Sequence, residues 1–304
     1  MGRKHRTGTE PEKGTNLDPG TDSVARPVVP RGRRRWSVLV WLSYAWIGIL
    51  IPIAIFAPLL PIPVIDAVVG PPRQPPQLGS IDLLLGTDTT GRSMLTRMVN
   101  GARVSLVVGA ASAAGGVAVG TFLGLLGGYF RGWIDRIVTL IADLLLSFPA
   151  LVLLLAITAI FSPSVPTLLV GLALASTPTF LRLARANTMA WSSREFVRAA
   201  RNIGASDARI LSREILPNVV PTLAAYLPLV VAALIVAEGS LSFLGLGIPP
   251  PTPSWGGMIS AGAAELRTVP HLVFVPATVL LITVFALNQA GEHLRRRFDR
   301  TLQD

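Results

Sequence analysis

The chain has 304 residues, of which 51% are hydrophobic and only 14% are charged. Soluble domains carry roughly 25% charged residues, so this chain has too little charge to cover a soluble globule. Its net charge of +10 would suit a nucleic-acid binder, but the basic residues flank apolar segments, which favours a membrane. With no cysteine and three widely spaced histidines, disulfides and thiol catalysis are excluded and a metal site is not expected.

The first 35 residues are rich in Gly, Pro, Thr and basic side chains and almost lack large apolar ones. We expect residues 1–35 to form a disordered basic cytoplasmic tail, because such a segment cannot bury a core. The apolar run of residues 36–60 begins too late for a secretory signal peptide. We therefore interpret it as a first transmembrane helix that stays in the protein.

Five further apolar runs are long enough, at 1.5 Å per residue, to cross a hydrocarbon core of ~30 Å. With the first run they predict an all-α membrane protein with six transmembrane helices. The second run contains Gly109, Gly115, Gly116, Gly120 and Gly124, which favour close helix packing, although a Gly-rich composition alone is the alternative. The five runs cover residues 104–126, 137–161, 166–183, 221–244 and 272–290.

The distribution of Lys and Arg predicts the orientation. With the N-terminus inside, 22 of the 27 Lys and Arg residues fall on cytoplasmic segments and five outside. The positive-inside rule then places both termini in the cytoplasm. The expected connections are an extracytoplasmic loop of residues 61–103, a cytoplasmic loop of 184–220, an outer loop of 245–271 and a cytoplasmic C-terminal tail of 291–304.

The cytoplasmic loop of residues 184–220 contains a pattern typical of a short amphipathic helix. Apolar residues recur at helical spacing on one face, and arginines lie on another. The apolar face comprises Phe196, Val197, Ala200 and Ile203, and the basic face comprises Arg194, Arg198 and Arg201.

Gly204 is placed to end this helix with a positive φ. Ser206 or Asp207 can cap a second helix, which we expect to stop before Pro217. On the pattern alone, two readings remain open: a surface that docks a partner, or a helix pair lying on lipid headgroups.

The chain has no phosphate-binding loop of the form G-x-x-x-x-G-K-[ST], which a nucleotide-driven pump needs. Ion-driven carriers instead bury charged residues in mid-membrane. Asp143 and Glu238 lie inside predicted spans but away from the midplane. For both residues, a structural role between helices and a place along a transport path remain open.

Several segments, in order over residues 80–300, resemble the permease subunits of binding-protein-dependent ABC importers of the dipeptide, oligopeptide and nickel family. Arg198 and Glu214 depart from that pattern, which often has Glu and His there. The matching segments are LGTDTTGRS at 85–93, GARVSL at 101–106, GY at 128–129, GWID at 132–135, Asp143, FP at 148–149, AARNIGAS at 199–206, LPN at 216–218, AEGSLSFLGLG at 237–247, Pro250, SWG at 254–256, and Asn288, Gly291, Leu294, Arg295 and Asp299.

The resemblance implies an ABC importer type I permease fold, with cytoplasmic coupling helices between spans 4 and 5. It favours the docking reading of the loop, in which these helices contact an ATPase. It also implies polar positions that serve a path or helix packing. The implied coupling residues are Phe196, Ala199, Ala200, Arg201, Gly204, Ala205 and Ser206, and the polar residues are Asp143, Glu238 and Asn288.

By the same resemblance, the chain is a subunit of an ATP-driven importer of dipeptides or oligopeptides in the cytoplasmic membrane. The implied partners are a sister permease, one or two cytoplasmic ATPases that bind ATP and Mg, and an extracytoplasmic peptide-binding protein. No catalytic residue, cofactor, metal or nucleic acid is expected on this chain. A nickel-chelate importer is the alternative, and an ion-coupled secondary transporter a more distant one.

Overall fold

The computed structural model describes Gly2 and residues 38–301, with the side chains of the last helix described through residue 298. The tail predicted over residues 1–35 and the start of the first predicted span therefore lie outside the described residues. Contacts separate Met1–Arg35 from Trp36–Asp304, and the helices of the described residues belong to the second unit.

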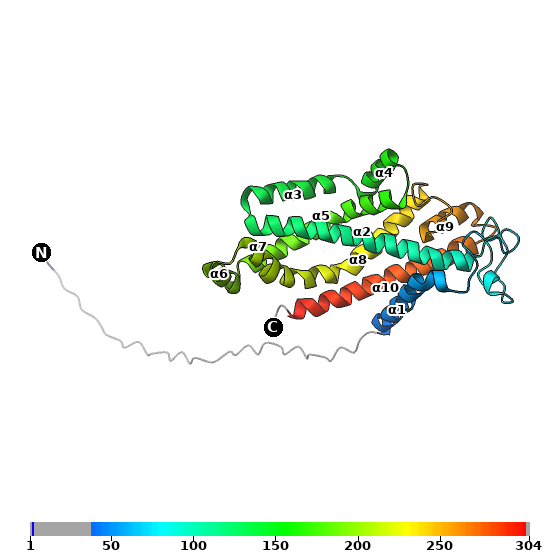
Figure 1. Cartoon of the computed structure of the whole chain (residues 1–304), viewed down its shortest axis with the longest axis horizontal. Coiled ribbons are helices and arrows are strands. Elements are labelled where there is room, and N and C mark those ends of the chain that lie inside the picture. Colours follow the sequence, from blue (N-terminus) through cyan, green and yellow to red (C-terminus); the bar gives the residue numbers. More distant parts are fainter. Residues whose placement is uncertain (1, 3–37, 302–304) are drawn as a thin grey trace. The chain divides into compact units, whose positions relative to one another are not determined.

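Between residues 38 and 301 the fold is helical, with two isolated β-bridges and no strand (Figure 1). The α-helices are α1 (Val38–Phe56), α2 (Met94–Phe130), α3 (Gly132–Ser147), α4 (Ala150–Phe161), α5 (Val165–Ser192), α6 (Glu195–Asn202), α7 (Asp207–Arg209), α8 (Leu216–Phe243), α9 (Trp255–Gly262) and α10 (His271–Thr301). Three short 3-10 helices, η1 (Ala57–Leu59), η2 (Ile81–Leu83) and η4 (Ala263–Glu265), and a π-helical segment, η3 (Ile210–Ile215), complete the described elements.

Five helical stretches of the described residues are long and apolar enough to cross a membrane, and the bent pair α3 and α4 supplies a sixth if it counts as one span. The predicted all-α membrane fold with six spans is thus confirmed, with one span broken. The helices α6 and α7 lie at one end of the bundle and α9 at the other (Figure 1). We call these the α6 end and the α9 end.

The centre of the bundle is the pair α2 and α5, which a row of glycines brings into close contact. Gly116, Gly120, Gly124 and Gly128 recur every four residues on the face of α2 that meets α5. A Cβ atom at Gly124 would lie 2.7 Å from the Cβ of Ala184 and 2.7 Å from a carbonyl oxygen of α5, closer than real Cβ atoms come. Helices in lipid associate by such backbone contact, so the glycines serve packing as predicted.

The third predicted span is not one helix. The axes of α3 and α4 meet at an angle of 85°. Phe148 is extended, and Pro149 precedes α4 as its N-cap, so the proline ring and its missing N–H interrupt the helix. The continuous helix predicted over residues 137–161 is therefore wrong.

Three other helices are longer than predicted. α2 begins at Met94 rather than at residue 104, so the loop expected over residues 61–103 is partly helical. α5 continues to Ser192 and α10 to Thr301, past the expected start of the C-terminal tail at residue 291. The apolar runs stop at the first charged residues, but the backbone hydrogen bonds of a helix continue through them.

α8 packs against α2, α9 and α10, and Trp255 at the start of α9 is fully buried among them. The indole Nε1–H of Trp255 donates to the carbonyl of Met98, and its backbone N–H donates to the hydroxyl of Ser105. On the other flank, α1 contacts α10, where the indole of Trp46 donates to Thr283 at 3.0 Å.

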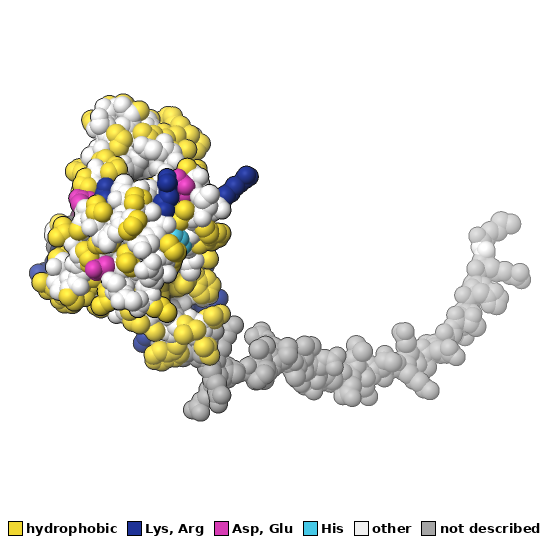
Figure 2. All heavy atoms as spheres, turned by 90° about the vertical axis from the view of Figure 1, so that its right-hand side faces the viewer, with side chains coloured by type: hydrophobic (Ala, Val, Ile, Leu, Met, Phe, Trp, Pro, Cys, Tyr) yellow, Lys and Arg dark blue, Asp and Glu magenta, His cyan; other side chains and the backbone are white. Residues whose placement is uncertain are grey.

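The connection from α1 to α2 folds over the α9 end as an ordered loop. The Asp88 carboxylate accepts backbone N–H groups of Thr90 and Arg92, and Arg97 lies 3.4 Å from its second oxygen. Arg73 reaches across to Glu265 at 2.6 Å. Figure 2 shows this end with basic and acidic side chains scattered over a mostly apolar and neutral surface.

Candidate functional site

The predicted amphipathic helix is present as α6, but its apolar side chains point in two directions. Val197 is fully buried and Ala200 is half-buried. Phe196 is 39% exposed and Ile203 is 86% exposed, so neither belongs to a single packed face. The bundle buries α6 at Val197, and the large side chains of Phe196 and Ile203 keep exposed surface.

Gly204 has the positive φ that the sequence predicts, +80°. The turn closes through backbone bonds from Gly204 to the carbonyl of Arg201 and from Ala205 to the carbonyl of Ala200. A Cβ atom at Gly204 would meet no atom within 4 Å. Glycine is therefore required here for its backbone conformation, and the space beside it is open.

The second helix does not stop before Pro217. It begins at Asp207 after Ser206, whose side chain makes no capping bond, and runs through η3 into α8 without a break. Pro217 therefore lies inside a continuous helical stretch from Asp207 to Phe243, and the π-type bonding of η3 just before it adjusts the backbone around its missing N–H. The helix that begins at Asp207 thus joins the membrane span directly.

Tyr129, near the end of α2, connects the bundle to α6 and α7. It is 8% exposed, and its hydroxyl donates to Oδ1 of Asp207 at 2.6 Å. Nη2 of Arg201 donates to the same hydroxyl at 3.1 Å, and the guanidinium carbon lies 5.5 Å from the centre of the ring. This hydrogen bond raises the pKa of Arg201 above its usual value.

Tyr129 was not among the predicted coupling residues, although it lies in a segment that resembles the permease family. A tyrosine next to the predicted end of the second span is a weak signal, because interface tyrosines are common in membrane proteins. Its contacts with Arg201 and Asp207 come from folding, since these residues are more than 70 positions away in the chain.

The seven predicted coupling residues lie together at the α6 end. Ala200 and Ala205 are half-buried against the bundle. The other five have exposed surface, so the site presents small residues beside Phe196 and several arginines. These five are Phe196, Ala199, Arg201, Gly204 and Ser206.

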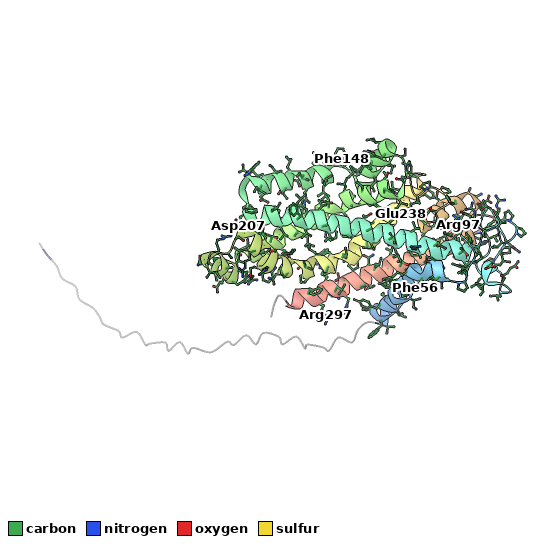
Figure 3. All side chains as sticks on the ribbon, in the orientation of Figure 1. Phe56, Arg97, Phe148, Asp207, Glu238 and Arg297 are labelled. Atoms are coloured by element: carbon green, nitrogen blue, oxygen red, sulfur yellow. The ribbon has the colours of Figure 1, made fainter. Side chains whose placement is uncertain are left out.

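The three predicted polar residues of the spans do not form one site. Asp143 of α3 pairs with Arg182 of α5 at 2.6 Å, and both side chains are more than half exposed. Glu238 of α8 is fully buried and accepts a hydrogen bond from Ser242 at 2.8 Å. Asn288 is exposed and donates to a carbonyl of its own helix. Figure 3 shows Asp207 at the α6 end and Glu238 further towards the α9 end.

A second ion pair supports the α3 contact. Arg185 donates to both carboxylate oxygens of Asp135, with Nη2 at 2.7 Å from Oδ2. Neither pair of ions offers an open metal site, and the described residues contain no group of three or more His, Cys, Asp or Glu that could hold a metal.

An apolar hollow of about 440 Å³ lies between α2 and α8, nearer the α6 end. No charged side chain lines it. Its walls include Ala118 and Phe122 of α2 and Val220 and Ala224 of α8.

The family model and the relatives that match this chain are all membrane components of transport systems. The family model described as binding-protein-dependent transport system inner membrane component matches residues 116–303. The glutathione transport system permease protein GsiD of Pectobacterium atrosepticum is 38% identical over 219 residues, which are 72% of this chain and 73% of the relative. GsiD of Escherichia coli O6:K15:H31 and of Shigella boydii serotype 4 are each 39% identical over 220 residues, with the same coverage.

Among solved structures, an inward-facing conformation of the MetNI methionine ABC transporter aligns with a TM-score of 0.56. The alignment covers 67% of this chain and 97% of that chain at 20% identity. At this identity the likeness shows the fold alone.

Proposed function

Because this chain belongs to the family of binding-protein-dependent transport system inner membrane components, we propose that it forms part of the path by which short peptides enter the cell. The chain is a permease subunit of an ABC importer. The relatives at 38–39% identity are named as glutathione transport permeases, and glutathione is itself a short peptide. This similarity supports peptides over nickel as the substrate.

An importer of this family works in general with a partner permease, an ATPase and a binding protein. For this chain, we assign the ATPase contact to α6, the Gly204 turn and α7, and we call α6 and α7 the coupling helices. The exposed Phe196, Ala199 and Gly204 support the assignment. A large apolar side chain beside small residues can enter a groove on another protein, because the small residues let the two surfaces approach closely. The sister permease would be a different chain. One or two ATPase chains would complete the importer complex.

We place both termini and the coupling helices in the cytoplasm. The Lys and Arg distribution supports this orientation, and the order of the helices supports one shared side for the termini and the coupling helices. α2 and α5 both finish at the α6 end, so α3 and α4 together must return the chain towards the α9 end. The bent pair then counts as one crossing, which brings the total to six.

We assign one wall of the path to the apolar hollow between α2 and α8. A peptide carries a charge at each end, and a wall without fixed charge would not hold either end tightly. Glu238 is buried away from such a path and we propose that it serves helix packing. Asp143 has the same role through its pair with Arg182.

In the proposed mechanism, nucleotide binding to the ATPase is coupled to the conformation of the membrane bundle. ATP binding changes the separation of the ATPase domains, and the coupling helices move with the surface on which they are seated. A ligand shifts a conformational equilibrium only by its differential affinity for the two states, so the loop must fit one nucleotide state better than the other. The membrane bundle then opens alternately to the two sides.

The experiment is uptake by the purified complex in vesicles that contain ATP, with its binding protein outside. We expect labelled peptide to accumulate only with internal ATP, and an ionophore that collapses ion gradients to leave uptake unchanged. Nickel uptake without peptide uptake would establish the alternative substrate. Peptide uptake that needs an ion gradient and no ATP would make the chain a secondary transporter.

A further inference from the structure

We propose that Tyr129 is the residue that fixes the coupling helices to α2, so that their movement is transmitted to the central helix pair. The proposal rests on the proposed function of α6 and α7 and adds a positioning residue outside them. Its basis is the group formed by the Tyr129 hydroxyl, the Asp207 carboxylate and the Arg201 guanidinium.

The connectivity of the chain gives the coupling helices two covalent links to the bundle. α6 follows α5 after a short turn, and α7 continues through η3 into α8. α2 has no such link, because it is followed by α3. Its hydrogen bonds to α6 and α7 are made by the Tyr129 side chain.

The geometry of Tyr129 suits a fixed link. Its hydroxyl uses both of its functions, donating to Asp207 at the first position of α7 and accepting from Arg201 in the last turn of α6. One atom thus connects the end of one coupling helix with the start of the next, on either side of Gly204. The ring packs in a buried cluster with Val197, Ile210 and Phe180.

The close contact of α2 with α5 determines what the link can move. Because Gly120, Gly124 and Gly128 place α2 against the backbone of α5, the two helices cannot slide past each other without clashes. A coupling helix pair held by Tyr129 therefore carries α2 and α5 as one body. Without the hydroxyl, α6 and α7 lose this link and could tilt about the turns at Ser193 and Gly204 while α2 stays in place.

The test uses the complete importer complex with Tyr129→Phe in this chain, which removes only the hydroxyl. Tyr226→Phe is the matched control, since Tyr226 also lies beneath an arginine, Arg295, and packs against the same buried cluster, but its hydroxyl forms no hydrogen bond with the described residues of α6 or α7. We expect Tyr129→Phe to keep the ATPase bound and to lower peptide uptake per ATP hydrolysed by roughly tenfold, the factor given by about 1.4 kcal/mol. The control should stay at the wild-type value.

A second measurement does not depend on the substrate. Spin labels at Val119→Cys on α2 and Ser212→Cys on η3, in this Cys-free chain, report the distance between α2 and the loop. We expect one narrow distance distribution in the parent and in Tyr226→Phe, and a broad one in Tyr129→Phe. The same broadening should appear with Asp207→Ala, whereas Asp207→Asn, which keeps an acceptor oxygen, should remain narrow.

Three results would overturn the proposal. They are a narrow distribution in Tyr129→Phe, unchanged uptake per ATP in that variant, or loss of the ATPase from its complex, which would make Tyr129 part of the docking surface itself. If the complex carries no peptide at all, the proposed function fails, but the distance measurement still decides the role of Tyr129.

Discussion

Replacing Gly204 with a graded series of side chains separates backbone strain from contact with the ATPase. Gly204 has a φ of +80°, and a Cβ atom there would meet nothing within 4 Å. Gly204→Ala therefore costs only the strain of an L-residue in the left-handed region, about 1–2 kcal/mol. This energy shifts the equilibrium between the native turn and other conformations by a factor of about 5–30.

Backbone strain and obstruction of the ATPase groove predict different orders of functional loss among the Gly204 variants. Strain alone predicts that Gly204→Asn is mildest, because Asn tolerates the left-handed region, and that Gly204→Ala and Gly204→Glu are alike. Obstruction of a groove predicts that Gly204→Ala retains most of its function. Gly204→Glu should then lose the ATPase, since a long charged side chain enters the docking surface.

Two assays follow the series: retention of the ATPase on the tagged complex, and ATP-dependent peptide uptake in vesicles. We expect normal membrane insertion throughout and a loss of both signals in Gly204→Glu. Wild-type retention and uptake in Gly204→Glu would refute the coupling assignment. Equal losses in Gly204→Ala and Gly204→Glu would refute the obstruction argument and leave strain as the cause.

Three further predictions concern packing, topology and the tail. Gly124→Ala should destabilise the complex by about 1–3 kcal/mol through overpacking against α5, whereas Gly48→Ala, with open space beside it, should not; thermal unfolding of the two purified variants decides. An impermeant thiol reagent added from outside should label Ser80→Cys and spare Ser212→Cys, and the reverse pattern would invert the proposed topology. Deletion of residues 1–30 should leave the yield of assembled complex unchanged, and loss of the ATPase on deletion would show that the tail is needed for docking.

Local patterns in the sequence predicted the helix α6 and the turn at Gly204 well. Both depend on neighbouring residues, since helical spacing and a C-terminal glycine act within one or two turns. The exposure of Ile203 could not be predicted in this way. The pattern placed Ile203 on one apolar face with Val197, but the bundle covers only the part of α6 around Val197 and leaves Ile203, just after the helix, exposed.

The bend at Phe148 had a visible signal in Pro149. The hydropathy of residues 137–161 does not reveal the bend, because the residues on both sides of it are apolar and a straight helix would have the same hydropathy. Pro217 gave the opposite error, because we expected a helix to stop before it, whereas the π-type bonding of η3 lets the helix continue past it. The sequence shows the proline in each case, and the tertiary contacts decide whether the helix ends there.

Glu238 and Tyr129 show the limit of prediction for the candidate site. The sequence places Glu238 in a span but does not tell which direction its carboxylate faces. Its complete burial results from α8 packing against α9 and α10. Tyr129 meets its partners only after α2, α6 and α7 have assembled, so no spacing along the chain records the contact.

The π-helical segment η3 sets the rotational phase between the coupling helices and α8. The N–H of Leu216 bonds to the carbonyl of Leu211, five residues back, so this turn holds one residue more than an α-helical turn. Removing one residue inside η3 would convert the turn to α-helix and keep the faces of α7 and α8 aligned. Removing one residue from α7 instead would rotate the loop by about 100° around the helix axis relative to α8, and Asp207 would turn away from Tyr129.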